Sequence, residues 1–146
     1  MIKAGLIGNG RWGKILNKKL TEISDLVFVS DSKTPYMSRL AEVDWVVVAT
    51  PNNSHYTIVK DCLLSGKNVF CEKPLTPSYE QSKDLYELAE RLGVSLYTSD
   101  VENFKDHSFI FLNQNFVERS KVESEKAKNL LYALAYHDFY LLYKYT

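Results

Sequence analysis

The stretch that decides the fold is GLIGNGRWGK, residues 5–14, a glycine-rich segment near the start of the chain. Its spacing Gly8-x-Gly10-x-x-Gly13 fits the dinucleotide fingerprint. In that pattern the first glycine permits a tight turn, the second lets a pyrophosphate approach the backbone, and the third lets a helix and a strand pack closely. The same glycines would also suit a plain turn between a strand and a helix, so the neighbouring segments have to decide between the two interpretations.

The segments around the glycines supply the context that the fingerprint requires. The pattern predicts a strand at residues 2–7, a helix from about Arg11 to Glu22 and a second strand at residues 26–30. Helix N-terminal amides from about Arg11 onward would complete an anion site. Trp12 either lines that site or packs under the turn. We therefore interpret the glycine segment as a pyrophosphate cradle.

Asp31 closes the second strand, 23 positions after Gly8. An acidic residue about 20 positions beyond the glycines is expected to hydrogen-bond a ribose hydroxyl, and Asp31 would do so for the adenosine ribose. The alternative is that Asp31 begins a turn with Ser32, as Asp often does. Lys33 lies nearby, so the sequence does not choose between NAD and NADP, which carries a 2′-phosphate.

Three further strands are predicted at residues 43–50, 68–72 and 94–99. The first is a near-continuous apolar run, which is typical of a parallel strand buried on both faces. It ends abruptly at Thr50-Pro51-Asn52-Asn53, at the carboxyl edge where ligands bind in open α/β sheets. The alternation of strands and helices predicts an α/β fold with a doubly wound, mainly parallel sheet and right-handed crossovers.

Two helices connect these strands. The first is predicted from Ser54, as its N-cap, to Ser65, with Gly66 as the C′ residue. The second is predicted to begin with Thr76 as cap and Pro77 in the first turn, and to end at Gly93. Its apolar positions fall at helical spacing: Leu85, Leu88, Ala89 and Leu92.

Three segments in this order resemble the Gfo/Idh/MocA family of NAD(P)-dependent oxidoreductases: GLIGNGRWG at the N-terminus, VVVATPNNSHY in the middle and CEKPL at residues 71–75. The resemblance covers residues 1 to about 100. It implies a Rossmann domain for the nicotinamide cofactor, followed in the family by an α/β domain that binds a sugar, cyclitol or nucleotide-sugar and often builds the dimer. The cofactor-binding residues it implies are Gly8, Asn9, Gly10, Arg11, Trp12, Gly13, Asp31, Ser32, Thr50, Pro51, Asn53, His55, Glu72 and Lys73.

Lys73 is a residue to which the resemblance gives a catalytic role. Oxidising a secondary alcohol requires a group that takes the hydroxyl proton while hydride leaves for the nicotinamide, and a lysine at the carboxyl end of a sheet can polarise that oxygen. In the family the matching lysine lies beside the nicotinamide, and the next residue is often a cis proline, so Pro74 is a candidate for one. The alternative is a solvated lysine in a strand-to-helix loop.

The segment LLYALAYHDFYLLYKY, residues 130–145, resembles the family helix whose histidine faces the substrate hydroxyl in an Asp-x-x-x-His pattern. His137 would be the proton relay, since histidine donates or accepts a proton near neutral pH. Ala133 stands where the acidic partner is expected, one turn earlier. The alternative is an aromatic-rich amphipathic helix in which His137 packs or faces solvent. Its aromatic side chains suggest a homodimer surface, unless they pack across the sheet as core.

Two lengths depart from the family pattern. Between Asp31 and Val43 stand only 11 residues, too few for the helix, strand and helix normally found there. We expect the strand order 2-1-4-5-6 in the usual labels, with strand 2 at the edge. After residue 100 the chain has 46 residues where the family places a second domain. We expect a dinucleotide-binding domain at 1–100, with 101–146 as a vestigial substrate or dimerisation segment packed on it.

The composition bears on partners and location. Lys plus Arg and Asp plus Glu number 18 each, which argues against a nucleic-acid partner. The longest apolar stretches fall far short of the roughly 20 residues of a membrane span. The chain runs straight into its first strand, unlike a signal peptide, so a cytoplasmic protein without a membrane partner is expected. Cys62 and Cys71 suit two reduced core thiols, and no metal-ligand spacing occurs.

Two functional hypotheses follow. The first is an NAD(P)-dependent oxidoreductase that transfers a hydride on a secondary alcohol of a sugar, cyclitol or nucleotide-sugar, with Lys73 and His137 as catalytic residues. The second is a non-catalytic dinucleotide-binding or interaction protein derived from the same family, which the shortened second half and Ala133 favour. A module for another nucleotide is weaker, because it leaves Glu72-Lys73-Pro74 without a purpose.

Overall fold

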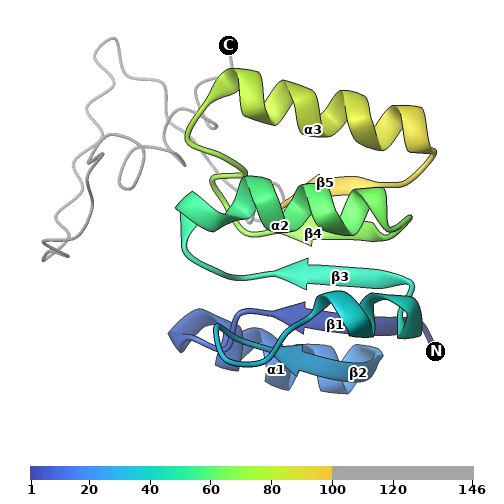
Figure 1. Ribbon diagram of the computed structural model, residues 1–146. Coiled ribbons are helices and arrows are strands. Elements are labelled where there is room, and N and C mark those ends of the chain that lie inside the picture. The colour runs from blue at the N-terminus through green and yellow to red at the C-terminus, as the bar shows by residue number, and fades with distance from the viewer. Residues whose placement is uncertain (100–146) are drawn as a thin grey trace, which may run out of the picture. The chain divides into compact units, whose positions relative to one another are not determined.

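The computed structural model describes residues 1–99, in which five parallel strands form one sheet (Figure 1). Their order is β2-β1-β3-β4-β5, which is the predicted order, with β2 at one edge. The doubly wound α/β prediction is confirmed. The strands are β1 (Lys3–Ile7), β2 (Asp25–Ser30), β3 (Trp45–Val48), β4 (Asn68–Cys71) and β5 (Leu96–Thr98).

The helices cover the sheet according to the direction in which the chain moves. From β1 the chain goes to one side for β2, and afterwards to the other side for β3, β4 and β5. Right-handed crossovers therefore place α1 on one face and the later helices on the opposite face. Figure 1 shows α2 and α3 side by side over the β3–β5 half of the sheet. The helices are α1 (Arg11–Ile23), the 3-10 helix η1 (Met37–Glu42), α2 (Asn52–Leu64) and α3 (Tyr79–Leu92).

The core lies between the sheet and the α2–α3 layer. β3 is buried along Val46, Val47 and Val48, as its continuous apolar run predicted. Burying each such valine contributes roughly 1.5–3 kcal/mol relative to exposure. The neighbouring strand and α2 add fully buried side chains from both sides: Val69, Cys71, Val59, Cys62 and Leu63.

Both α2 and α3 start at other residues than the sequence predicted. α2 begins at Asn52, because the Pro51 carbonyl already accepts a hydrogen bond from the backbone N–H of Ser54 at 2.9 Å. Ser54 is therefore inside the first turn and is not the cap. The predicted C′ residue is confirmed, since Gly66 follows the C-cap Ser65 with φ +70°.

α3 is capped by Ser78, whose hydroxyl accepts from the backbone N–H of Gln81 at 3.4 Å. Thr76 is not the cap because its hydroxyl donates to the Ser78 carbonyl at 2.6 Å and lies 2.7 Å from Ser82 Oγ. Pro77 accordingly precedes the cap. Gly93 ends the helix with φ +66° as predicted. Leu92, the last helical residue, is 42% exposed, so the predicted apolar face buries only Leu85, Leu88 and Ala89.

A single 3-10 helix replaces the elements missing between β2 and β3, as the 11-residue spacing predicted. Leu40 of η1 is buried in the core. The Arg39 guanidinium lies 5.4 Å from the Phe28 ring centroid, and it contacts Glu42 at 2.6 and 2.8 Å. The short connection is thus fixed to the edge strand by one apolar side chain and one cation–π contact.

Cys62 and Cys71 are free, buried thiols, which confirms their prediction as core residues. Burial raises the pKa of Cys62 to about 12, and it also raises the pKa of Cys71. In residues 1–99 no helix is long and apolar enough to cross a membrane. Within the same range, no group of three or more His, Cys, Asp and Glu side chains is placed to hold a metal ion. His137, Ala133, the predicted 130–145 helix and the division at residue 100 lie outside the described residues.

Candidate functional site

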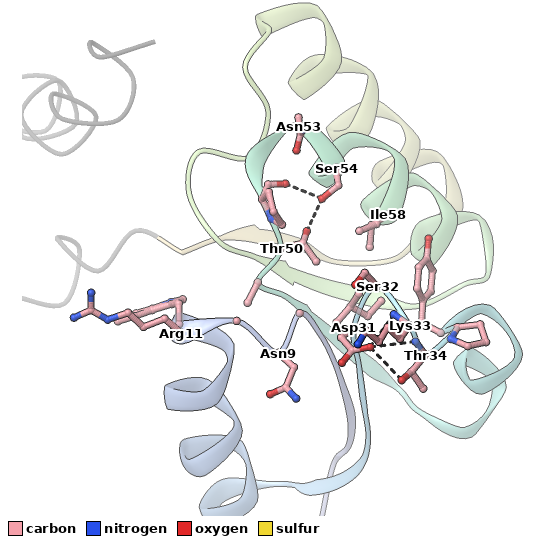
Figure 2. Close-up of a pocket in the computed structure, with 18 residues that line it drawn as sticks. Asn9, Arg11, Asp31, Ser32, Lys33, Thr34, Thr50, Asn53, Ser54 and Ile58 are labelled. Carbon is pink, nitrogen blue, oxygen red and sulfur yellow. Dashed lines mark hydrogen bonds between the residues drawn. The ribbon is translucent and has the colours of Figure 1, made fainter. Parts of the chain in front are cut away.

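An open cleft of about 990 Å³ lies at the carboxyl ends of β1, β2 and β3 (Figure 2). From β1 the chain moves to one side for β2 and to the other side for β3, so the strand order reverses between β1 and β3. Open α/β sheets bind ligands at such a point. Three loops line the cleft, and they bring together residues far apart in the sequence. The lining residues are Ile7 to Trp12 from the first loop, Asp31 to Tyr36 from the second, and Ala49, Thr50, Pro51, Asn53, Ser54 and Ile58 from the third loop and α2.

The three fingerprint glycines meet different constraints. Gly8 has φ +115°, and a Cβ there would lie 2.3 Å from the Ala49 carbonyl oxygen. A Cβ at Gly13 would lie 1.9 Å from the Gly8 carbonyl oxygen, so this residue serves the packing of α1 on the turn. At Gly10 an added Cβ would meet no described atom within 4 Å, and its φ of −72° suits any residue. The protein itself requires Gly8 and Gly13, whereas the space at Gly10 is left open.

The N-terminus of α1 begins beside that open space. Gly10 is the N-cap and offers no side chain to the first-turn amides, and the first turn contains no acidic residue. Unpaired first-turn N–H groups and the helix dipole favour an anion there. Figure 2 shows Arg11 at one end of the cleft and the Asp31–Thr34 turn at the other. Trp12 is 47% exposed and lines the cleft, which decides between its two sequence interpretations.

Asp31 organises the second loop. Its Oδ1 accepts hydrogen bonds from the Lys33 N–H at 2.9 Å, the Thr34 N–H at 3.1 Å and the Thr34 hydroxyl at 3.2 Å. The Lys33 amide is the main cause that lowers the pKa of this carboxyl. The turn interpretation is therefore confirmed. It does not exclude the ribose prediction, because all three bonds use Oδ1 and Asp31 also lines the cleft.

The far end of the second loop is apolar. Pro35 and Tyr36 line the cleft there, together with Ile58 of α2. The Tyr36 hydroxyl donates to Asp61 Oδ2 at 2.8 Å, and burial is the main cause that raises the pKa of this phenol. The sequence prediction missed several lining residues: Ile7, Thr34, Pro35, Tyr36, Ala49, Ser54 and Ile58. For Thr34, Pro35 and Tyr36 the available signal was the length of the connection, since so short a loop keeps its residues close to the edge of the sheet.

Glu72 and Lys73 follow β4 and do not line the described cleft. The Glu72 N–H donates to the Val48 carbonyl at 2.9 Å, which continues the pairing with β3 beyond the strand. Lys73 is half-buried. The peptide bond between Lys73 and Pro74 is cis, as predicted. The catalytic role of Lys73 stays a prediction.

The prediction that His55 contacts a cofactor has to be corrected. Its side chain is fully buried in the first turns of α2 and does not line the cleft. Nε2 lies 2.9 Å from the Thr50 carbonyl oxygen, and Nδ1 lies 3.0 Å from the Pro74 carbonyl oxygen. Both ring nitrogens are thus engaged by backbone carbonyls, so His55 has no surface left for a ligand.

Comparison with known proteins identifies the family to which the fold belongs. Residues 16–99 match the model GFO_IDH_MocA, described as an oxidoreductase family with an NAD-binding Rossmann fold. An uncharacterized oxidoreductase of Streptococcus pneumoniae is 30% identical over 139 residues, which cover 80% of this chain and 38% of that protein. The scyllo-inositol 2-dehydrogenase (NADP(+)) IolW of Bacillus subtilis is 30% identical over 114 residues, covering 65% of this chain and 32% of the relative.

Solved structures give the same result. UDP-N-acetylglucosamine 3-dehydrogenase GnnA from Acidithiobacillus ferrooxidans superimposes with a TM-score of 0.67 at 25% identity, over 70% of this chain and 39% of that one. GenD2 from gentamicin A biosynthesis, solved in complex with NAD, gives a TM-score of 0.64 at 28% identity, over 68% and 34% of the two chains. The chain thus spans well under half the length of these relatives.

Proposed function

The chain belongs to the Gfo/Idh/MocA family of oxidoreductases, and from this premise we propose that it is an enzyme that oxidises or reduces a sugar-like substrate. The cofactor is NAD or NADP, as the family model and the NAD complex of GenD2 indicate. The proposed reaction is hydride transfer on a secondary alcohol of a sugar, cyclitol or nucleotide-sugar. Two relatives named above act on substrates of this kind, an inositol and a UDP-N-acetylhexosamine.

The observation that carries the proposal is the open space at Gly10. Neither the backbone conformation nor a neighbouring atom requires glycine there. Glycine at this position allows a ligand to approach the backbone next to the first-turn amides of α1. Pyrophosphate fits this donor set, because it is an anion whose oxygens accept hydrogen bonds from N–H groups.

Residues of the second loop would bind the adenosine end of the dinucleotide. Asp31, held ionised by its turn, would accept hydrogen bonds from the hydroxyls of the adenosine ribose. We infer a preference for NAD over NADP, because a 2′-phosphate would bring negative charge next to this carboxylate. Lys33 lines the same cleft, and its positive charge would reduce this preference.

The chemistry at the other end rests on Lys73. When bound, the nicotinamide ring accepts or supplies the hydride. Lys73 then polarises the substrate oxygen, taking the hydroxyl proton during oxidation and returning it during reduction. His137 is proposed as a second proton-transfer residue, with Ala133 at the position where the family carries an acidic partner. A non-catalytic NAD-binding protein is the second candidate, and Ala133 is the observation that favours it.

Titration of the purified chain with NADH and NADPH, followed by nicotinamide fluorescence, tests the cofactor site. Saturable binding with NADH tighter than NADPH is expected. The Gly10→Val variant is the control, because it adds bulk only in the open space. Turnover of sugars, inositols or nucleotide-sugars with the bound cofactor would then separate the enzyme from the non-catalytic candidate. A folded protein that binds neither dinucleotide would contradict both.

A further inference from the structure

His55 is an unusual side chain for its position. Its side chain is fully buried in the core, among apolar neighbours on α2 such as Val59 and Cys62. Burying a polar ring is unfavourable unless its nitrogens find partners. Here both nitrogens lie within 3.0 Å of backbone carbonyl oxygens, Thr50 on one side and Pro74 on the other. The two contacts explain why a histidine occupies a site that a leucine would fill at lower cost.

The two carbonyls belong to loops with different predicted tasks. Thr50 lies just beyond the end of β3 and lines the proposed cofactor cleft. The Ala49–Thr50 backbone also lies against the glycine turn, since a Cβ at Gly8 would be 2.3 Å from the Ala49 oxygen. Pro74 follows Lys73 directly. A continuous series of contacts therefore runs from the glycine turn through Thr50 and His55 to the residue next to Lys73.

The loop that carries Lys73 is also anchored at its other end. Leu75 and Thr76 are buried, and the Thr76 hydroxyl contacts Ser78 and Ser82 of the α3 start at 2.6 and 2.7 Å. His55 is the side chain that reaches the Lys73 end of this loop from α2. Removing the imidazole would leave a buried carbonyl without its donor and would release that end, while the Thr76 end stays in place.

We propose that His55 is a positioning residue that fixes Lys73 relative to the cofactor cleft by holding the Pro74 and Thr50 carbonyls on one imidazole ring. The effect of this positioning on cofactor binding rests on the proposed function. The imidazole ring sets the distance between the loop that carries Lys73 and the loop after β3, so the nicotinamide end of the site depends on His55. The proposed pyrophosphate and adenosine ribose contacts come from the first and second loops, whereas the His55 ring contacts the third loop at Thr50 and the Lys73 loop at Pro74.

The test compares two ligands and three variants of the full chain. NADH probes the whole site, and ADP-ribose lacks the nicotinamide. His55→Leu removes both ring nitrogens and thus both contacts with the carbonyls, and His55→Asn keeps a polar side chain too short to span both carbonyls. Leu63→Ala is the control, a core truncation on the same helix at a fully buried residue. Hydrogen exchange of residues 72–78, measured without ligand, reports the anchoring of the loop directly.

His55→Leu is expected to weaken NADH binding about tenfold, the size expected for an unsatisfied buried carbonyl, and to leave ADP-ribose binding nearly unchanged. Exchange should rise in residues 72–78 and stay unchanged in β1. Leu63→Ala should affect both ligands alike. Equal losses for NADH and ADP-ribose in His55→Leu, or unchanged exchange at 72–78, would overturn the proposal.

If His55→Leu does not fold, His55→Asn is expected to show the same selective loss at smaller size, and unchanged NADH binding with unchanged exchange would overturn the proposal. Wild-type chain that binds neither ligand would contradict the proposed function instead. The exchange measurement would then still decide whether His55 anchors the loop.

Discussion

The cofactor cleft and the Lys73 loop lie at the same edge of the sheet, yet they are built in different ways. The cleft is made of backbone turns whose side chains are absent, as at Gly8 and Gly10, or exposed, as at Trp12. The Lys73 loop is partly buried and is held by side-chain contacts, from His55 of α2 to Pro74 at one end and between Thr76 and Ser82 of α3 at the other. The glycine turn of the cleft therefore depends on local backbone geometry, and the placement of Lys73 depends on contacts across the fold.

The largest effect is expected from a substitution that breaks the cleft itself. In Gly13→Val the new Cβ would fall 1.9 Å from the Gly8 carbonyl oxygen, a backbone atom that cannot move without displacing β1 or α1. The cost is expected to reach roughly 5 kcal/mol, comparable with the whole stability of a small domain. Urea unfolding followed by circular dichroism measures it. A cooperative, wild-type-like transition would show that the turn adapts.

Lys73→Ala tests the other region, and its effect should be confined to chemistry. Turnover of a substrate found by screening is expected to fall about 10³-fold, the range of general acid–base contributions. NADH affinity should stay within about threefold of the wild-type value, because Lys73 does not line the described cleft. Steady-state kinetics and fluorescence titration separate the two. Unchanged turnover would make Lys73 a bystander.

Gly10→Val sharpens the comparison within the cleft. An added Cβ meets no described atom within 4 Å, so stability is expected to change by about 1 kcal/mol or less, the range of N-cap effects. NADH affinity should fall about 100-fold, equivalent to roughly 2.7 kcal/mol, because the side chain takes the space assigned to the pyrophosphate. Gly10→Ala is the matched smaller change. Retained affinity in both variants would remove the pyrophosphate from this position.

Asp31→Asn addresses the choice of cofactor. The amide keeps an oxygen for the Lys33 and Thr34 N–H groups but removes the charge that opposes a 2′-phosphate. The ratio of NADH to NADPH affinity is expected to fall about tenfold. Paired titrations with the two dinucleotides give the ratio. An unaltered ratio would place the adenosine ribose away from Asp31.

The smallest effect is the pH dependence of the same carboxylate. Its pKa in the folded chain is below the ordinary 3.8, so its turn stabilises the fold at pH values above 3.8 and loses that contribution as pH falls through the folded pKa. Affinity for NAD⁺, which tolerates acid, should be flat between neutral pH and about pH 5 and decline only below about pH 4. Calorimetric titration of wild type and Asp31→Asn tests this. A decline in the wild type alone is expected, and identical profiles would assign the titration to another group.

The glycine turn and the short β2–β3 connection could be predicted because each depends on local spacing, and the strand order because the family resemblance implies it once the short connection is taken into account. The starts of α2 and α3 could not, because Ser54 and Thr76 are good caps by residue type and only the hydrogen bonds of Pro51 and Ser78 decide between neighbours. For Asp31 the sequence offered a turn or a ribose contact, and the geometry accommodates both.

The contacts that the sequence prediction missed join distant residues. Tyr36 reaches Asp61 across 25 positions, and His55 reaches Pro74 across 19. No periodicity or spacing rule applies at such separations. The sequence therefore predicted many of the residues that line the cleft, but not the contacts that hold the Lys73 loop.

The position of Trp12 gives the chain an internal optical reporter. The sequence contains two tryptophans, and Trp12 lines the cleft whereas Trp45 on β3 stacks with Tyr97 at 6.1 Å between ring centroids. Tryptophan emission overlaps the absorption of reduced nicotinamide, so excitation of the indole would pass to bound NADH and appear as nicotinamide light. A Trp12→Phe chain would keep only the emission of the sheet tryptophan, and the difference between the two spectra would follow the filling of the cleft without any added dye.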